Sequence, residues 1–304
     1  MAGPHARLVA ALLGTLLAGL LAGCAAPASG QSPASDDRAL ITTAPNGARE
    51  EIPVTIDKPE GPGPFPAVVI MHDCSGLGPR SSGAPGRWAR ELGSRGYVTM
   101  IPDSFTTRGH PDGVCTDASP TRGEVAPSRR VRDAYAALAH ARALPYVDGR
   151  RVGLMGGSHG GSTTLASMAA PESTREPLAR EKGAGFAAAV ALYPSCGTTL
   201  GDSTGTYRPV APILILIGEK DDWTPAETCV KLAASTRASE YPVAITVYPG
   251  AHHSFDSDRP VRFVAARVNR NAPGGRGATT GGNATAWADS IRRVAEFFGE
   301  RLKP

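Results

Sequence analysis

The chain of 304 residues lacks the features that mark several large classes of protein. It has no CxxC pair and no paired cysteine–histidine spacing, so the sequence predicts no metal site. Its formal net charge is only +4, which gives no basis for nucleic-acid binding. It contains no internal repeat and, beyond residue 23, no second long hydrophobic run. What remains is a length that suits one large domain.

The first residues are expected to be a targeting segment. Arg7 precedes an apolar run of 16 residues, 8–23, which is short for a membrane span of about 20. A cationic start, an apolar core and small residues at the end are typical of an export signal. The run ends in "LAGC", which resembles the lipobox of bacterial lipoproteins and implies cleavage before Cys24 and acylation of its thiol. A plain signal peptide that contains a cysteine is the alternative.

We therefore expect three parts: a lipoprotein signal peptide over 1–23, a flexible tether over 24–47 and a single folded domain over 48–304. The tether is expected because residues 25–40 are small, polar and contain proline. A lipid on Cys24 would place the protein in a bacterial cell envelope, on the periplasmic or outer face.

Cysteine usage agrees with export. Apart from Cys24 there are four cysteines: Cys74, Cys115, Cys196 and Cys229. An even number in an oxidising compartment predicts two disulfides. Buried free thiols are the alternative.

Short apolar runs alternate with helical patterns along the rest of the chain. Near-continuous Val, Ile and Leu predicts six strands that are covered on both faces, at 66–72, 97–102, 151–156, 187–193, 212–218 and 243–249. Helical patterns cover 86–96, 128–144 and 284–302. This alternation predicts an α/β fold with a mostly parallel, doubly wound sheet flanked by helices.

The remaining segments follow neither pattern. The stretch "EIPVTIDKP" near residue 51 is expected to begin an antiparallel edge of the sheet. Residues 103–127, 194–210 and 256–283 are expected to be long irregular connections, and such loops are usually functional or disordered.

One serine has the surroundings of a nucleophile. The pattern Gly156-x-Ser158-x-Gly160 follows a predicted strand and opens a helix, which is the context of a nucleophile elbow. The same spacing of glycines occurs around Ser203, but that serine lies in a polar loop with no helix after it. Ser158 is therefore the candidate nucleophile.

A serine nucleophile needs a base and an orienting carboxylate, in the chain order Ser, Asp or Glu, His. Asp221 lies just beyond one predicted strand, and His252 and His253 lie just beyond the next. Ligands bind at the carboxyl ends of strands in open α/β sheets, so these residues are expected to converge. Taken singly, Asp221 could be a solvated turn residue and either histidine a surface residue.

From about residue 48 to 302 the chain resembles the dienelactone hydrolase family of α/β-hydrolases, and within it an exported, cysteine-containing branch. The motifs that carry the resemblance are, in order, "HDCSGLGPR", "PDSFTTRGHPDGVC", "GLMGGSHGGST", "GEKDDWTP", "YPGAHHSF" and "GATTGGN". Five or six motifs in order over most of the chain make a specific match. The resemblance implies the α/β-hydrolase fold.

Carried over residue by residue, the family pattern implies Ser158 as nucleophile, Asp221 as the acid of the triad and His253 as the base. It implies an oxyanion hole made by the backbone N–H groups of Cys74 and His159. A Ser–His–Asp triad requires no cofactor for ester hydrolysis.

Two departures bear on the substrate. The founding dienelactone hydrolases have a cysteine where Ser158 stands and a glutamate where Asp73 stands. Both departures weaken the case for a dienelactone substrate and leave ester hydrolysis intact.

The implied fold also bears on the cysteines. Of three possible connectivities it favours Cys74–Cys115, which would brace the oxyanion loop, together with Cys196–Cys229, beside the loop of the acid. Candidates for the substrate pocket are Arg80, Arg108, Trp223 and residues 256–283, with Tyr207 and Arg208 as weaker ones. Each could equally face solvent or fill the core.

The function expected from the sequence is a lipid-anchored serine hydrolase that cleaves carboxylic esters or lactones of small molecules. One alternative is a non-catalytic binding protein of the envelope that has kept the fold. Another is a peptidase of prolyl-oligopeptidase type, because "GGSHGG" also resembles that elbow. The absence of a propeller domain counts against the peptidase.

Overall fold

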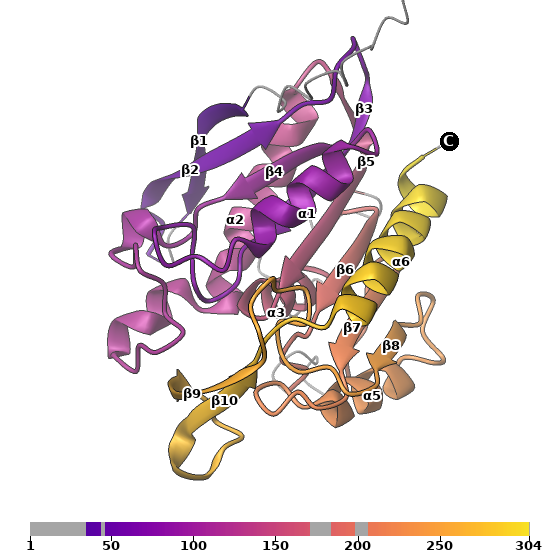
Figure 1. Cartoon of the computed structure of the whole chain (residues 1–304). Coiled ribbons are helices and arrows are strands. Elements are labelled where there is room, and N and C mark those ends of the chain that lie inside the picture. Colours follow the sequence, from indigo (N-terminus) through magenta and orange to yellow (C-terminus); the bar gives the residue numbers. More distant parts are fainter. Residues whose placement is uncertain (1–34, 44–45, 171–183, 198–205, 304) are drawn as a thin grey trace, which may run out of the picture. The chain divides into compact units, whose positions relative to one another are not determined.

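The computed structural model describes residues 35–43, 46–170, 184–197 and 206–303 (Figure 1). These residues belong to one compact unit, Pro33–Pro304. The expected leader and the lipidation site at Cys24 lie outside the described residues, as does Ser203. None of the helices in the described ranges is both long enough and apolar enough to cross a bilayer.

The centre of the fold is an eight-stranded sheet with the order β1-β2-β4-β3-β5-β6-β7-β8. Strands β3 to β8 run parallel, while β2 pairs antiparallel with both β1 and β4. The strands are β1 (Ser35–Thr43), β2 (Arg49–Asp57), β3 (Phe65–Met71), β4 (Val98–Pro102), β5 (Val147–Gly157), β6 (Ala188–Leu192), β7 (Ile213–Gly218) and β8 (Ala244–Tyr248). The expected mostly parallel α/β sheet is confirmed.

Helices cover both faces of this sheet. In Figure 1, α1 (Ala84–Gly93) and α6 (Ala284–Leu302) lie on the near face, and α2 (Pro127–Ala143) and α3 (His159–Ser167) lie behind it. The rings of Trp88 and Trp287 meet edge to face at 4.7 Å and join α1 to α6. A further helix, α5 (Ala226–Ser235), follows β7. Because both faces are covered, strands β4, β6 and β7 are buried along their whole length.

The helical patterns match the structure closely. In α2, Val131, Tyr135, Leu138 and Ala141 are all buried on one face, as their spacing predicts. The last helix has the bounds expected from the sequence, Ala284–Leu302. Its N-cap residue is Asn283, whose side chain accepts a hydrogen bond from the amide of Ala286.

One expectation about the start of the domain is wrong. Strand β1 occupies residues 35–43, which were expected to belong to the tether over 24–47, so only the part before Ser35 remains open to that description. The antiparallel edge expected near residue 51 is present: it consists of β2 and β1, with β1 outermost. The sequence signal was weak: of the β1 side chains that the structure describes, Leu40 and Thr42 are buried, whereas Arg38 and Ala39 are exposed.

The segment 256–283 also differs from expectation, because it contains a hairpin of β9 (Arg262–Val268) and β10 (Arg276–Thr280). The sequence does not predict these strands, because β9 is largely exposed and has no buried apolar run. Residues 103–127 form short 3₁₀ turns, η1 (Thr106–Arg108) and η2 (Pro120–Val125). The expected loop over 194–210 lies partly outside the described residues.

Candidate active site

Ser158 lies in a strained turn between β5 and α3. Its backbone has φ 53° and ψ −115°, a region that a residue with a side chain rarely adopts. The amide of Ser158 donates to the carbonyl of Leu192 at 2.9 Å, which ties the turn to the end of β6. Strain of this kind is found where a turn must present one side chain, and here it presents the serine hydroxyl above the sheet.

The two glycines of the motif are required by close approach of backbone. A Cβ on Gly160 would lie 1.9 Å from the carbonyl oxygen of Met71. A Cβ on Gly156 would lie 2.5 Å from the carbonyl group of Gly160. Helix α3 can therefore begin against the ends of β3 and β5 only with glycine at both positions.

His253 connects the serine to a carboxylate. Its Nε2 lies 2.8 Å from Ser158 Oγ, and its Nδ1 lies 2.8 Å from Asp221 Oδ2. His253 and Asp221 are buried, and Ser158 is 8% exposed. The three side chains come from loops that follow β5, β7 and β8, so the carboxyl ends of the strands bring them together. This is the geometry that proton transfer from a serine to an oriented imidazole requires.

The carboxylate of Asp221 is fixed by further donors. Oδ1 accepts from the amides of Trp223 at 3.0 Å and Thr224 at 2.8 Å. Thr224 Oγ1 lies 2.9 Å from Asp221 Oδ2, 3.0 Å from His253 Nδ1 and 3.0 Å from the carbonyl oxygen of Tyr193. Thr224 was not among the residues expected at the site. Its position three residues after Asp221 allows both its amide and its hydroxyl to reach the Asp221 carboxylate.

Two aromatic rings hold the imidazole of His253. The ring of Tyr193 lies 4.7 Å from it and the ring of Trp223 4.8 Å. The hydroxyl of Tyr193 donates to buried Asp256 at 2.7 Å, and Trp88 Nε1 donates to the same carboxylate at 2.9 Å. Burial raises the pKa of Asp256 and also that of Tyr193. The imidazole of His253 is therefore enclosed by a packed shell that reaches Trp88 of α1.

Two backbone amides beside Ser158 are free to bind an anion. Cys74 and His159 both line the same cleft as the serine. Among the described residues, neither the N–H of Cys74 nor that of His159 donates a hydrogen bond. His159 is the first residue of α3, where helix amides have no partner within the helix.

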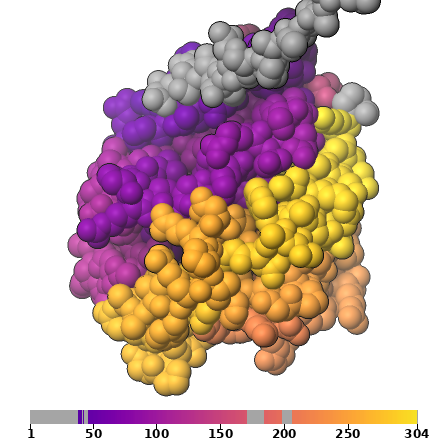
Figure 2. Space-filling view, viewed as in Figure 1, coloured from indigo at the N-terminus to yellow at the C-terminus, as the bar shows by residue number. Residues whose placement is uncertain are grey.

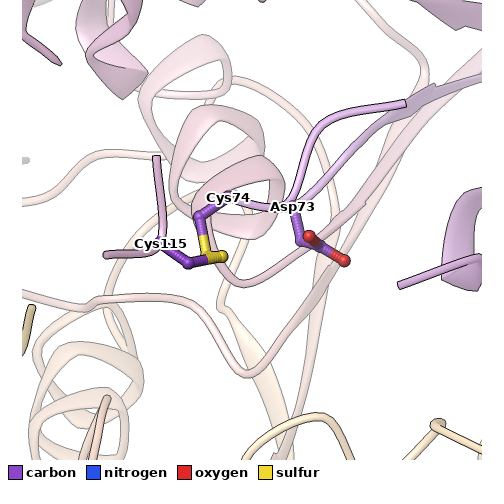
Figure 3. A group of neighbouring side chains, drawn as sticks. All are labelled: Asp73, Cys74 and Cys115. Atoms are coloured by element: carbon purple, nitrogen blue, oxygen red, sulfur yellow. A yellow bond between two sulfur atoms is a disulfide. The ribbon is translucent and has the colours of Figure 1, made fainter. Parts of the chain in front are cut away.

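The four remaining cysteines are bonded as Cys74–Cys115 and Cys196–Cys229. This is the pairing that the family resemblance implied. Figure 3 shows that the carboxylate of Asp73 points away from the first disulfide. Asp73, Cys74 and Cys115 are close enough in space to suggest a metal site, but the two sulfurs are bonded to each other and are not thiolate ligands. The carboxylate of Asp73 accepts from Ser75 and Ser82.

The serine opens into a cleft of about 550 Å³. This volume is within the range of sites for small molecules. Its walls come from segments far apart in the sequence: Cys74, 118–120, Arg122, Gly123, Ala126, Pro127, Ser158, His159, Ser162, Ser195, Trp223, Thr224, Val268, Arg270 and Asn271.

Comparison with known proteins identifies the family of the chain. The model of the dienelactone hydrolase family matches residues 52–302. The chain belongs to this family. Because a dienelactone is a cyclic carboxylic ester, membership places the chain among the carboxylic-ester hydrolases.

Individual relatives are distant. A protein of Methylorubrum extorquens named "Putative carboxymethylenebutenolidase" is 26% identical over 219 residues, covering 68% of this chain and 69% of that one. Esterase 2 of Thermogutta terrifontis, in a structure phosphorylated by paraoxon, has a TM-score of 0.63 at 18% identity and covers 90% and 97% of the two chains. Dipeptidyl peptidase 4 of Porphyromonas gingivalis has a TM-score of 0.55 at 20% identity, and the match covers 90% of this chain but 36% of that one. The two structures are similar in fold.

In this dienelactone hydrolase family member, only some of the expected pocket residues reach the cleft. Trp223 lines it, and residues 256–283 contribute Val268, Arg270 and Asn271. In Figure 2 the orange-to-gold segment that contains β9 and β10 lies against the purple segments. The amide of Val268 donates to the carbonyl of Cys115 at 3.0 Å, which joins the hairpin to the cysteine loop.

The other expected pocket residues have different surroundings. Arg108 binds Glu50 and Asp133 in an ion cluster away from the cleft. The side chain of Arg80 is 76% exposed, and the hydroxyl of buried Tyr207 donates to the carbonyl of Leu165. Arg208 does not line the cleft either.

Two arginines of the cleft were missed. Arg122 and Arg270 line the cleft although they are 148 residues apart in the sequence. Burial, together with the positive charge of Arg270, lowers the pKa of Arg122. No sequence signal distinguishes them from the many other arginines in irregular segments of this chain. Their proximity is a product of the tertiary fold.

Proposed function

We propose that the protein is a serine hydrolase that cleaves carboxylic esters or lactones of small molecules through an acyl-enzyme on Ser158. The observation that carries the proposal is the continuous chain from Ser158 Oγ through His253 to Asp221, with 2.8 Å at each step. The strained backbone of Ser158 supports it, because strain of this kind clusters at active sites.

In the first half of the reaction His253 Nε2 takes the proton of Ser158 Oγ as the oxygen attacks the ester carbonyl. Asp221 accepts from Nδ1, which fixes the tautomer that leaves Nε2 as the acceptor and stabilises the imidazolium. The protonated imidazole then gives its proton to the leaving alcohol. In the second half, water attacks the acyl-enzyme with His253 as base.

The negative charge that develops on the carbonyl oxygen would be received by the amides of Cys74 and His159. Each such donor typically lowers the barrier by about 3 kcal/mol. Only the backbone of Cys74 is needed, which is consistent with the use of its sulfur in a disulfide.

The cleft favours small substrates. Its volume of about 550 Å³ accommodates a molecule of modest size with the scissile carbonyl over Ser158. A serine where founding members have cysteine, and Asp73 where they have glutamate, weaken the case for dienelactones themselves. We therefore propose esters or lactones as a class.

We further propose that the protein is exported and anchored by a lipid on Cys24, facing the aqueous side of the bacterial envelope. Support comes from the leader pattern that ends in "LAGC" and from two disulfides, which form and persist in oxidising compartments. Metabolic labelling with an alkynyl fatty acid in a bacterial host tests this. Label on the full-length chain that is lost in Cys24→Ala is expected, and equal label on both would contradict it.

The test of the catalytic proposal is labelling of the full-length chain with a fluorophosphonate probe, followed by peptide mass mapping. An adduct on Ser158 is expected, absent in His253→Ala and retained in His252→Ala. His252 is the matched control because it is the neighbouring histidine, and its ring contacts the carbonyl of Lys220 rather than the serine. A folded, disulfide-intact chain without an adduct on Ser158 would refute the enzyme and favour the non-catalytic binding protein.

A further inference from the structure

Arg130 of α2 is a fully buried cation with unusual partners. It is 0% exposed, and no carboxylate of the described residues lies within ion-pair distance of its guanidinium. One terminal nitrogen donates to the carbonyl of His72 at 2.9 Å, and the other donates to Nδ1 of His159 at 2.8 Å. Its Nε has no partner, and the guanidinium lies 4.9 Å from the centre of the Phe105 ring.

Such an arrangement is costly for folding alone. A buried charge is normally paired with an opposite charge, and nearby Asp133 is already bonded to Arg108. Burial lowers the pKa of Arg130 to about 10, so the group is still positively charged at neutral pH. Costly, strained or unpaired groups persist mainly where the site uses them.

The two partners of Arg130 belong to the two segments that carry the free amides beside Ser158. His72 is two residues before Cys74, in the loop after β3. His159 is the residue directly after Ser158 and supplies the other amide itself. No other described side chain donates to both segments.

The contact also determines the state of His159. Because the guanidinium donates to Nδ1, the neutral imidazole carries its proton on Nε2. Burial, and then the charges of Arg130 and Arg122, hold the pKa of His159 well below its usual range. His159 is therefore a neutral, fixed ring, and it also contacts Phe105 edge to face at 5.5 Å.

We propose that Arg130 is a positioning residue for the oxyanion hole: its guanidinium ties the Cys74 segment to the His159 segment and holds a positive charge between them. This inference rests on the proposed role of these two amides. Arg130 is not among the residues that line the cleft, and its hydrogen-bond partners are His72 and His159 rather than Ser158, so its effect is on the geometry and field that receive the developing oxyanion.

The test compares Arg130→Met and Arg130→Lys with Arg129→Met in the full-length chain. Arg129 is the adjacent arginine of α2 and pairs with Glu50 and Glu124, outside the oxyanion segments. The readouts are the acylation rate from the burst of p-nitrophenol with p-nitrophenyl acetate, KM, and the rate of fluorophosphonate labelling of Ser158.

For Arg130→Met, the acylation and labelling rates are expected to fall about 100-fold, as for loss of one oxyanion donor, with KM changed less than about threefold. Arg130→Lys keeps the charge but cannot span both acceptors, so a fall of about tenfold is expected. Arg129→Met is expected to stay within about threefold of the parent. If Arg130 were only structural, its replacement would not lower the acylation rate while leaving KM nearly unchanged, and lysine would not restore part of that rate.

The outcomes separate the two proposals. If the parent chain acquires no adduct on Ser158, the catalytic proposal fails and the role of Arg130 fails with it. If the parent is labelled and folded Arg130→Met acylates at the parent's rate, only the role of Arg130 is refuted. Should Arg130→Met not fold, Arg130→Lys decides, and an unchanged acylation rate there overturns the inference.

Discussion

Asp221 and Asp222 are adjacent in the sequence and have different surroundings. Asp221 is buried and accepts hydrogen bonds from His253, Thr224 and the amide of Trp223. Asp222 is exposed, and its carboxylate accepts from the amide and hydroxyl of Thr279 at 2.8 Å each. A one-residue difference in position therefore separates a carboxylate that orients the imidazole from one that holds the β9–β10 hairpin.

Asp221→Asn is expected to lower kcat by about 10³–10⁴-fold with the fold retained. The amide can donate to His253 Nδ1, which would move the proton to Nε2 and remove the acceptor that Ser158 needs. Asp222→Asn is the control and is expected to keep kcat within a few-fold. Steady-state hydrolysis of p-nitrophenyl acetate, with thermal unfolding as a check, measures both. Equal losses in the two variants would contradict the assignment of Asp221.

At the scale of elements, a buried ion cluster joins the antiparallel edge of the sheet to α2. Glu50 of β2 binds Arg108 and Arg129, and Arg108 also binds Asp133 of α2. Burial raises the pKa of Glu50, but the hydrogen bonds and charges of Arg108 and Arg129 outweigh it and hold that pKa below its usual 4.5. The cluster fixes β2, and with it β1, to the rest of the fold.

Glu50→Gln is expected to lower the free energy of unfolding by roughly 1–2 kcal/mol at pH 7, between the values for exposed and buried pairs. Because the folded pKa of Glu50 is depressed, its contribution is present above the unfolded value and is lost as pH falls through the folded value. The difference between parent and variant should therefore shrink as pH falls below 4.5. Urea unfolding at pH 7 and pH 4 measures it. The control is Glu51→Gln, at the exposed neighbouring position, which should change the free energy of unfolding little. If the difference in free energy of unfolding between the parent and Glu50→Gln grows in acid, the prediction is contradicted.

At the scale of the whole molecule, the two disulfides link segments at the same edge of the sheet; Cys229 lies in α5, and the other three cysteines lie in loops. Cys74 and Cys115 follow β3 and β4, and Cys196 and Cys229 follow β6 and β7. They close loops of similar length, with sequence separations of 41 and 33 residues. Only the first includes a residue whose amide is proposed to bind the oxyanion.

Replacing either pair by serines is expected to lower the free energy of unfolding by about 3 kcal/mol, because both loops are of similar length. The Cys74/Cys115 double variant is expected in addition to lose at least tenfold in acylation rate, because its loop carries the Cys74 amide. The Cys196/Cys229 double variant is the matched control. Burst kinetics and denaturant unfolding on both variants test this, and a similar fall in acylation rate in the two would argue against a special role for the first disulfide.

Sequence patterns predicted the parallel strands, the helices at their flanks and the candidate positions Ser158, Asp221 and His252 or His253, and the family resemblance then favoured His253. These features are local: apolar runs report burial on both faces, and the glycines around Ser158 report a backbone that only they permit. The strand ends then place the three residues at one edge, so their convergence could be anticipated without coordinates.

The remaining features depend on how the elements pack. The 2.8 Å contacts of His253, the bridge made by Arg130 and the cleft position of Arg122 and Arg270 depend on segments that packing brings together from distant parts of the chain. Strands β1 and β9 were missed for lack of a buried apolar run: Arg38 and Ala39 of β1 are exposed, and β9 is largely exposed. Contacts between distant segments are specified by the whole fold, and no short stretch of sequence carries them.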